Sequence, residues 1–68
     1  MKLSARNVLK GKIVDVTKGQ TTAHVRLDIG GAIVTASITN QAVDELKLAP
    51  GGNAYAVIKA SDVMIGVK

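Results

Sequence analysis

The sequence predicts an all-β domain, a five-stranded OB-like Greek-key barrel with one short helix between its third and fourth strands. Most of the 68 residues follow the two-residue alternation typical of β-strands. Turn residues divide the alternating part into five segments, and one short segment with helix-start residues interrupts it. Five strands with a helix after the third is the element order of such a barrel, whereas a β-sandwich would need more strands.

The first three strands are predicted over residues 8–16, 21–29 and 32–39. The first is rich in β-branched residues and contains Gly11, where we expect a bulge or a close approach of another backbone. Between the second and third strands, Gly30-Gly31 can adopt the positive φ that a two-residue hairpin turn requires. The second strand alternates most clearly, with apolar Ala23, Val25, Leu27 and Ile29 on one face and polar Thr22, His24, Arg26 and Asp28 on the other.

The remaining elements follow a break in this alternation. Residues 39–46 begin with capping residues and space two apolar residues on one side, which predicts one or two helical turns. A turn is expected at residues 50–52, where proline is followed by two glycines. Residues 53–59 then alternate as the fourth strand, residues 60–62 interrupt the pattern, and residues 63–67 form the predicted final strand.

The length of the chain limits how it can be stabilised. Residues 1–68 are expected to form a single domain, and so small a domain usually needs disulfides, a structural metal or oligomerisation. The chain has no cysteine and one histidine, so disulfides are impossible and no directly ligated metal is expected. We therefore expect a homo-oligomer with its functional site at a subunit boundary.

The charge balance favours an anionic ligand. Nine Lys and Arg residues against five Asp and Glu give a net charge of +4. Small single-strand nucleic-acid binders also need several stacking aromatic residues, and this chain has one tyrosine and no Phe or Trp. A small inorganic or phosphorylated anion is therefore the favoured ligand. The N-terminus becomes charged too early for a signal peptide, and no apolar run is long enough to span a membrane, so a cytoplasmic location is expected.

No catalytic motif is recognisable, and we do not expect an enzyme. The only histidine, His24, lies on the polar face of a predicted strand without a spacing relation to a candidate nucleophile. The carboxylates are scattered, and neither a phosphate-binding loop nor a dinucleotide fingerprint is present. No covalent cofactor is expected either.

Three groups of hydrogen-bond donors remain as candidates for an anion site. One precedes the first strand, one lies at the predicted helix start, where free N–H groups favour a negative charge, and one follows the fourth strand. Each group has an ordinary alternative role as a frayed terminus, a helix cap or a solvated strand end. The three groups are Ser4-Ala5-Arg6-Asn7, Thr39-Asn40-Gln41-Ala42 and Lys59-Ala60-Ser61.

Three segments resemble the molbindins, which are stand-alone Mop domains related to transport-associated OB domains. They are Ser4-Ala5-Arg6-Asn7 with Leu9-Lys10-Gly11, Ala36-Ser37-Ile38-Thr39, and residues 57–64 with Lys59-Ala60-Ser61-Asp62. The resemblance covers the whole chain. It implies an OB-like barrel assembled as a homohexamer, a trimer of dimers, that binds and stores molybdate or tungstate in the cytoplasm for molybdenum homeostasis. It also implies that seven residues bind the oxyanion across a subunit interface: Ser4, Ala5, Arg6, Asn7, Thr39, Lys59 and Ser61.

Two other functions are compatible with the sequence alone. A small basic OB module that binds nucleic acid would explain the barrel order and the charge of +4. A structural or regulatory oligomer, in which the N-terminal segment completes the sheet of a neighbour, would explain the short chain. Neither alternative requires the three donor groups to meet.

Overall fold

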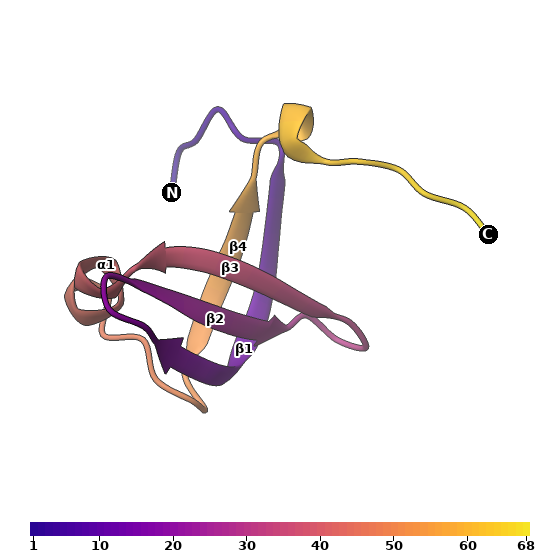
Figure 1. The fold of residues 1–68 in the computed structure, drawn as a ribbon. Coiled ribbons are helices and arrows are strands. Elements are labelled where there is room, and N and C mark those ends of the chain that lie inside the picture. Colours follow the sequence, from indigo (N-terminus) through magenta and orange to yellow (C-terminus); the bar gives the residue numbers. More distant parts are fainter.

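The computed structural model describes residues 1–68 and is mostly β, which confirms the predicted class. Its four strands form one antiparallel sheet in the order β3-β2-β1-β4, which curls into a half-open barrel (Figure 1). No helix is long and apolar enough to cross a membrane. The elements in chain order are β1 (Asn7–Lys18), β2 (Thr22–Asp28), β3 (Ile33–Thr39), α1 (Asn40–Glu45), β4 (Asn53–Ile58) and the 3-10 turn η1 (Ala60–Asp62).

Strand β1 is long because it belongs to two ladders. Residues 7–12 pair with β4, and residues 12–18 pair with β2. The register shifts between Ile13 and Asp15, where Val14 is the extra residue of a β-bulge. Figure 1 shows β1 descending beside β4 and then turning to run beside β2. This bend gives the sheet its curl.

Gly11 lies where the two halves of the sheet meet. A Cβ atom at this position would lie 2.5 Å from the carbonyl oxygen of Asp28 and 2.9 Å from Cγ of Leu27. The prediction of a close backbone approach at Gly11 is therefore confirmed, while the bulge lies a few residues later in the strand. Only glycine lets the end of β2 pass this closely over β1.

We expect Gly11→Ala to lower the free energy of unfolding by about 1–3 kcal/mol, because the added methyl group must displace backbone rather than a flexible side chain. Urea unfolding followed by circular dichroism measures this loss. Gly66→Ala is the matched control, since a Cβ there meets no atom within 4 Å. Equal free energies of unfolding for Gly11→Ala and Gly66→Ala would show that β1 and β2 can move apart at Gly11 without loss of stability.

The core is small and lies inside the curl of the sheet. The alternation predicted for the second strand is confirmed for apolar residues 23, 25 and 27, which are buried, and for polar residues 22, 24 and 26, which are exposed. Asp28 and Ile29, at the end of the predicted strand, are both half-buried. Six partly buried apolar residues surround the core. The five buried residues are all aliphatic: Ile13, Ala23, Val25, Leu27 and Val43.

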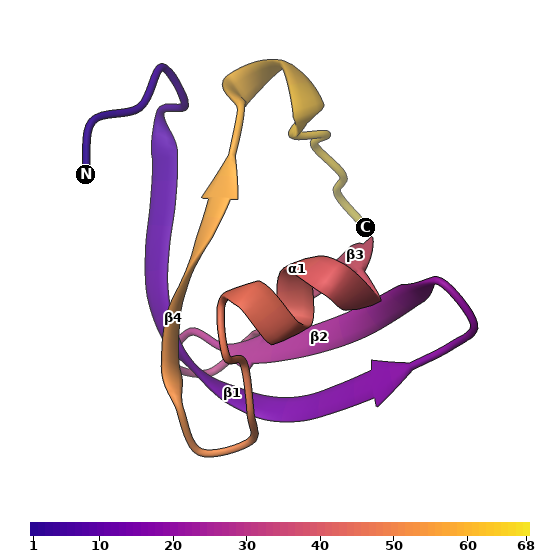
Figure 2. The same ribbon diagram turned by 90° about the vertical axis from the view of Figure 1, so that its left-hand side faces the viewer.

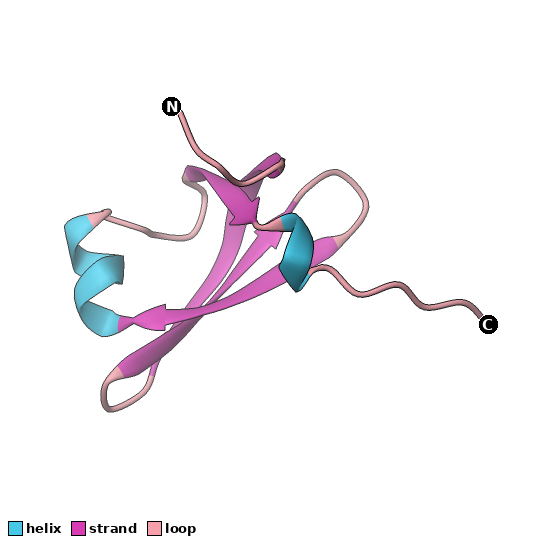
Figure 3. Cartoon of the chain, turned by 90° about the horizontal axis from the view of Figure 1, so that it is seen from above, coloured by secondary structure: helices cyan, strands magenta, loops and turns pink.

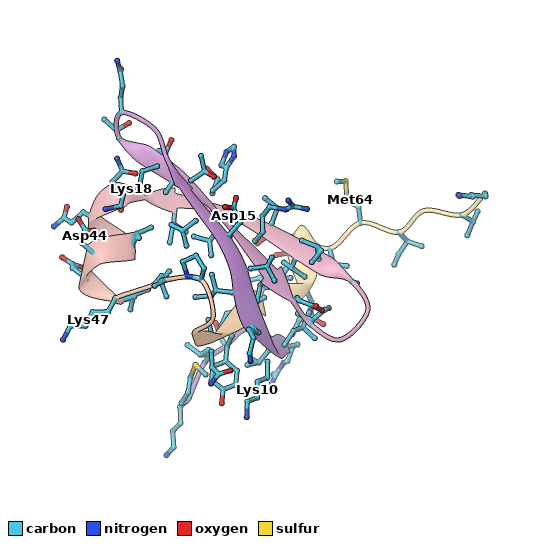
Figure 4. The ribbon with its side chains drawn as sticks, turned by 90° about the horizontal axis from the view of Figure 1, so that it is seen from below. Lys10, Asp15, Lys18, Asp44, Lys47 and Met64 are labelled. Carbon is cyan, nitrogen blue, oxygen red and sulfur yellow. The ribbon has the colours of Figure 1, made fainter.

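Helix α1 covers one open end of this core (Figure 2). It is only six residues long, so packing of Val43, which is 3% exposed, stabilises it more than helix propensity does. The Thr39 side chain caps its N-terminus by accepting a hydrogen bond from Ala42 N at 3.0 Å. A surface ion pair of 2.6 Å between Lys18 and Asp44 links the helix to the end of β1 (Figure 4).

The connection between β2 and β3 is longer than the two-residue turn expected at Gly30-Gly31. The strands end at Asp28 and resume at Ile33, and both glycines have positive φ, as expected. The Asp28 carboxylate accepts hydrogen bonds from the N–H groups of both glycines, at 2.9 and 3.3 Å. This side-chain cap closes the turn and extends it to four residues.

The predicted fifth strand is wrong for the single chain. After β4 the backbone enters η1, and residues 63–68 continue without a strand partner. The alternation of residues 63–67 is typical of a strand, but it does not specify an edge with which the strand pairs. The barrel is consequently open between β3 and β4, the two edge strands of the sheet.

Candidate anion-binding site

The ladder between β1 and β4 brings two of the three predicted donor groups together. Asn7 pairs with Ile58, so residues 4–6 and residues 59–61 extend from adjacent strand ends. Figure 2 shows both segments at the same end of the molecule. We call Ser4, Ala5, Arg6, Asn7, Lys59 and Ser61 the donor cluster.

Two local interactions hold the donor cluster in place. The Asn7 side chain donates a hydrogen bond from Nδ2 to the carbonyl oxygen of Ile58, at 3.2 Å in a partly buried position. This bond fastens the start of β1 to the end of β4. In η1, the Asp62 N–H donates to the Lys59 carbonyl at 2.9 Å, which fixes the turn that carries Ser61. Asn7 thus has a structural role in addition to its predicted role in binding.

The charges of the donor cluster are not neutralised within the chain. Arg6 and Lys59 are exposed, and neither forms an ion pair, because the only salt bridge joins Lys18 to Asp44 at the other end of β1. The hydroxyl groups of Ser4 and Ser61 are also exposed and have no hydrogen-bond partner. One exposed carboxylate, Asp62, follows Ser61 in the same turn. The cluster therefore presents two cations and several free donors to solvent.

Thr39 lies away from the donor cluster. It pairs with Thr22 at the start of β2, and that end of β2 lies beside the C-terminal end of β1. The donor cluster lies at the N-terminal end of the same strand. The Thr39 hydroxyl accepts the hydrogen bond from Ala42, so its own proton is free to be donated to a ligand. Asn40 fixes this corner by donating from Nδ2 to the carbonyl of Gly19 at 2.9 Å.

The largest concave surface is not an anion site. It is an apolar groove of about 680 Å³ between β3 and β4, and 13 of its 15 lining residues are hydrophobic. None of the seven predicted site residues lines it. No separate pattern of residues indicates this groove, because its apolar side chains alternate in the same way as those of the interior of a closed barrel. A smaller polar depression of about 230 Å³ is formed by Thr17, Lys18, Gly19, Thr22 and His24, which are all exposed.

Comparison with known proteins identifies relatives of the whole chain. A probable molybdenum-pterin-binding protein from Haemophilus influenzae is 49% identical over 69 residues, covering 100% of both chains. The solved structure of MopII from Clostridium pasteurianum has a TM-score of 0.90 and 46% identity, covering 97% of this chain and 100% of MopII. The cytoplasmic molybdate-binding protein ModG, solved with molybdate bound, has a TM-score of 0.93 and 45% identity, covering 100% of this chain and 49% of ModG.

These matches confirm the resemblance that the sequence segments indicated. They also support the OB-like class of the fold, and they give no support to the nucleic-acid alternative. The model of the TOBE domain matches residues 3–65, which includes the donor cluster, Thr39 and all four strands. The chain therefore belongs to the TOBE domain family, as a domain of the Mop type.

Proposed function

We propose that this protein binds molybdate or tungstate and stores it in the cytoplasm for molybdenum homeostasis, without catalysing a reaction. The observation that carries the proposal is the donor cluster, in which Arg6 and Lys59 are unpaired and adjacent at one end of the sheet. The relatives support the same ligand, since the Haemophilus protein and a relative from Clostridium pasteurianum are named molybdenum-pterin-binding proteins. ModG is described as a cytoplasmic molybdate-binding protein and was solved with molybdate bound.

The chemistry of the donors suits a tetrahedral dianion that carries no proton at neutral pH. Such a ligand only accepts hydrogen bonds, so the ideal site consists of donors and cations. Arg6 supplies directional, charge-assisted hydrogen bonds, and Lys59 supplies a compact positive charge. The hydroxyls of Ser4, Ser61 and Thr39, with the backbone N–H groups of residues 5 and 7, complete the set. Protonated phosphate would lack one acceptor position and bind less tightly.

A complete site requires more than one subunit, because Thr39 and the donor cluster lie at opposite ends of β1. Near Thr39, the buried Oδ1 of Asn40 has no hydrogen-bond donor within the chain. Twelve large hydrophobic residues are exposed, among them Leu46, Tyr55 and Met64, which is far more apolar surface than a small monomer tolerates easily. We propose a homohexamer built as a trimer of dimers, in which the donor cluster of one subunit faces Thr39 of another.

Calorimetric titration of the purified protein with molybdate, tungstate and sulfate tests the proposal. We expect molybdate and tungstate to bind at least about tenfold more tightly than sulfate, a difference of about 1.4 kcal/mol. Sulfate has the same charge and shape but is smaller, so a rigid site of fixed size discriminates against it. Thermal melting provides a second measurement, because a ligand that binds only the native state raises Tm. Equal affinity for the three anions would refute a molybdate site.

A further inference from the structure

Positive charge is concentrated in one half of the molecule. Residues 1–12 and 53–68, which the ladder between β1 and β4 joins, contain six Lys and Arg residues and one acidic side chain, Asp62. Residues 13–52, which contain β2, β3, α1 and the second part of β1, have three Lys and Arg residues and four acidic side chains. The donor cluster lies in the basic half, so Asp62 is the only acidic side chain that shares this half with it.

Asp62 is also the only acidic side chain of the protein without an interaction partner. The carboxylates of Asp28 and Asp44 form the turn cap and the ion pair described above. Those of Asp15 and Glu45 accept hydrogen bonds of 2.9 and 3.1 Å from side chains of their own elements. The Asp62 carboxylate forms neither a hydrogen bond nor an ion pair, although it lies in the half of the molecule that is rich in cations.

Turn η1 holds Asp62 next to the donor cluster. The Asp62 N–H donates to the Lys59 carbonyl at 2.9 Å, which closes the turn and brings the two residues back together. Figures 2 and 3 show η1 beside the start of β1, which Arg6 directly precedes. Asp62 is exposed, so its carboxylate adds negative charge to the edge of a site that otherwise consists of donors and cations.

A negative charge at this position opposes a bound dianion. Charges closer together than about 10 Å are only partly screened at 0.1 M salt, and the double charge of the ligand doubles the energy of repulsion. The repulsion acts on the bound anion and not on the free one, so it raises the dissociation constant. It acts equally on any dianion that occupies the same place, because it depends on charge and distance alone.

We propose that Asp62 limits the affinity of the donor cluster for its oxyanion, so that the stored dianion can be released. This inference rests on the proposed function, because it assigns a role within the same site. Neither Arg6 nor Lys59 forms an ion pair with Asp62, so both cations stay available to the ligand. Asp62 therefore weakens binding by its charge without blocking the site, which suits a protein that must give up the anion it stores.

Asp62→Asn tests this role, because it removes the charge and keeps the shape of the side chain. The hydrogen bond that closes η1 comes from the backbone of residue 62, so the turn is preserved. Asp15→Asn is the matched control: it removes the same charge from the other half of the molecule, and its amide oxygen still accepts the hydrogen bond from Thr17. Each protein is titrated calorimetrically with molybdate and with sulfate, at about 0.01 M and about 1 M salt, where the Debye lengths are about 30 and 3 Å.

We expect Asp62→Asn to lower the dissociation constants for molybdate and for sulfate by the same factor, at least about threefold at low salt. At high salt the gain should largely disappear, because an exposed charge is then screened. Asp15→Asn should leave both dissociation constants nearly unchanged. At low salt, an unchanged or higher dissociation constant in Asp62→Asn, or an equal gain in Asp15→Asn, would overturn the inference. So would a gain for molybdate alone, or one that persists at high salt, because Asp62 would then act through the shape of the site.

The same titrations distinguish a failure of this inference from a failure of the proposed function. If the natural protein binds molybdate no more tightly than sulfate, the molybdate site is refuted, and the sulfate titrations still measure the effect of Asp62. If the natural protein prefers molybdate and Asp62→Asn does not bind it more tightly, only the role of Asp62 is wrong.

Discussion

Replacing Ile13 with alanine is expected to lower the free energy of unfolding by about 2–5 kcal/mol and to leave much of the protein unfolded at 37 °C. Ile13 is 2% exposed and is the largest fully buried side chain of a core with only five buried residues. A domain of this length has a total stability of roughly 3–10 kcal/mol, so this one cavity removes a large share of it. Urea unfolding at a fixed protein concentration measures the loss.

Val14→Ala is the matched control for this change. Val14 is the next residue along β1, but it lies at the bulge and is 46% exposed. Its truncation is expected to cost less than about 1 kcal/mol, because it leaves no enclosed cavity. Similar losses at the two positions would mean that the buried core is not the main source of stability. Contacts between subunits would then have to supply it.

The local part of the fold was predictable from the sequence. The alternation over residues 21–29 correctly identified which side chains of β2 are buried, because one face of that strand covers the core and the other meets water. The cap at Thr39 and the turn glycines were also identified correctly, since each depends on a residue's own conformational preference or its immediate neighbours.

Features that depend on distant partners were less predictable. Strand β1 is longer than residues 8–16, because it pairs with β4 at its start and with β2 at its end. Residues 63–67 have a strand pattern but no strand partner in the single chain. A pattern of side chains fixes which face of a strand is apolar, but it does not specify which edge the strand joins.

In the candidate site, too, the local chemistry was predictable from the sequence and the spatial arrangement was not. Residues 4–7 and 59–61 were identified as donors from their chemistry, but their adjacency comes from the pairing of Asn7 with Ile58, 51 residues apart. Thr39 was identified by the same chemistry and lies at the opposite end of β1. The expectation that the donor groups meet across subunits came from the family resemblance. The structure of the single chain is compatible with this expectation, because Thr39 and the donor cluster lie apart within one chain.

The double variant Arg6→Ala with Lys59→Ala is expected to weaken molybdate binding by about a hundredfold or more. Each hydrogen bond to a charged group contributes about 1.5–3 kcal/mol, and both changes remove a positive charge from the donor cluster. Calorimetric titration measures the loss. Arg26→Ala with Lys47→Ala is the matched control, because it removes the same charges from exposed positions outside the donor cluster. An equal loss of molybdate affinity in the control would mean that the net charge of the protein, and not the donor cluster, explains the effect.

Mixing two variants that each bind molybdate poorly distinguishes a binding site shared between subunits from a binding site within one chain. Arg6→Ala removes a donor from the cluster, and Thr39→Asp keeps a residue type that caps α1 while opposing a dianion with negative charge. Each variant alone is expected to bind molybdate poorly. If Arg6 and Thr39 of different subunits face each other, refolding the two variants together at equal concentrations restores about a quarter of the tight sites by random assembly. If both residues of a site belonged to one chain, no mixture would restore binding, since every chain carries one of the two defects.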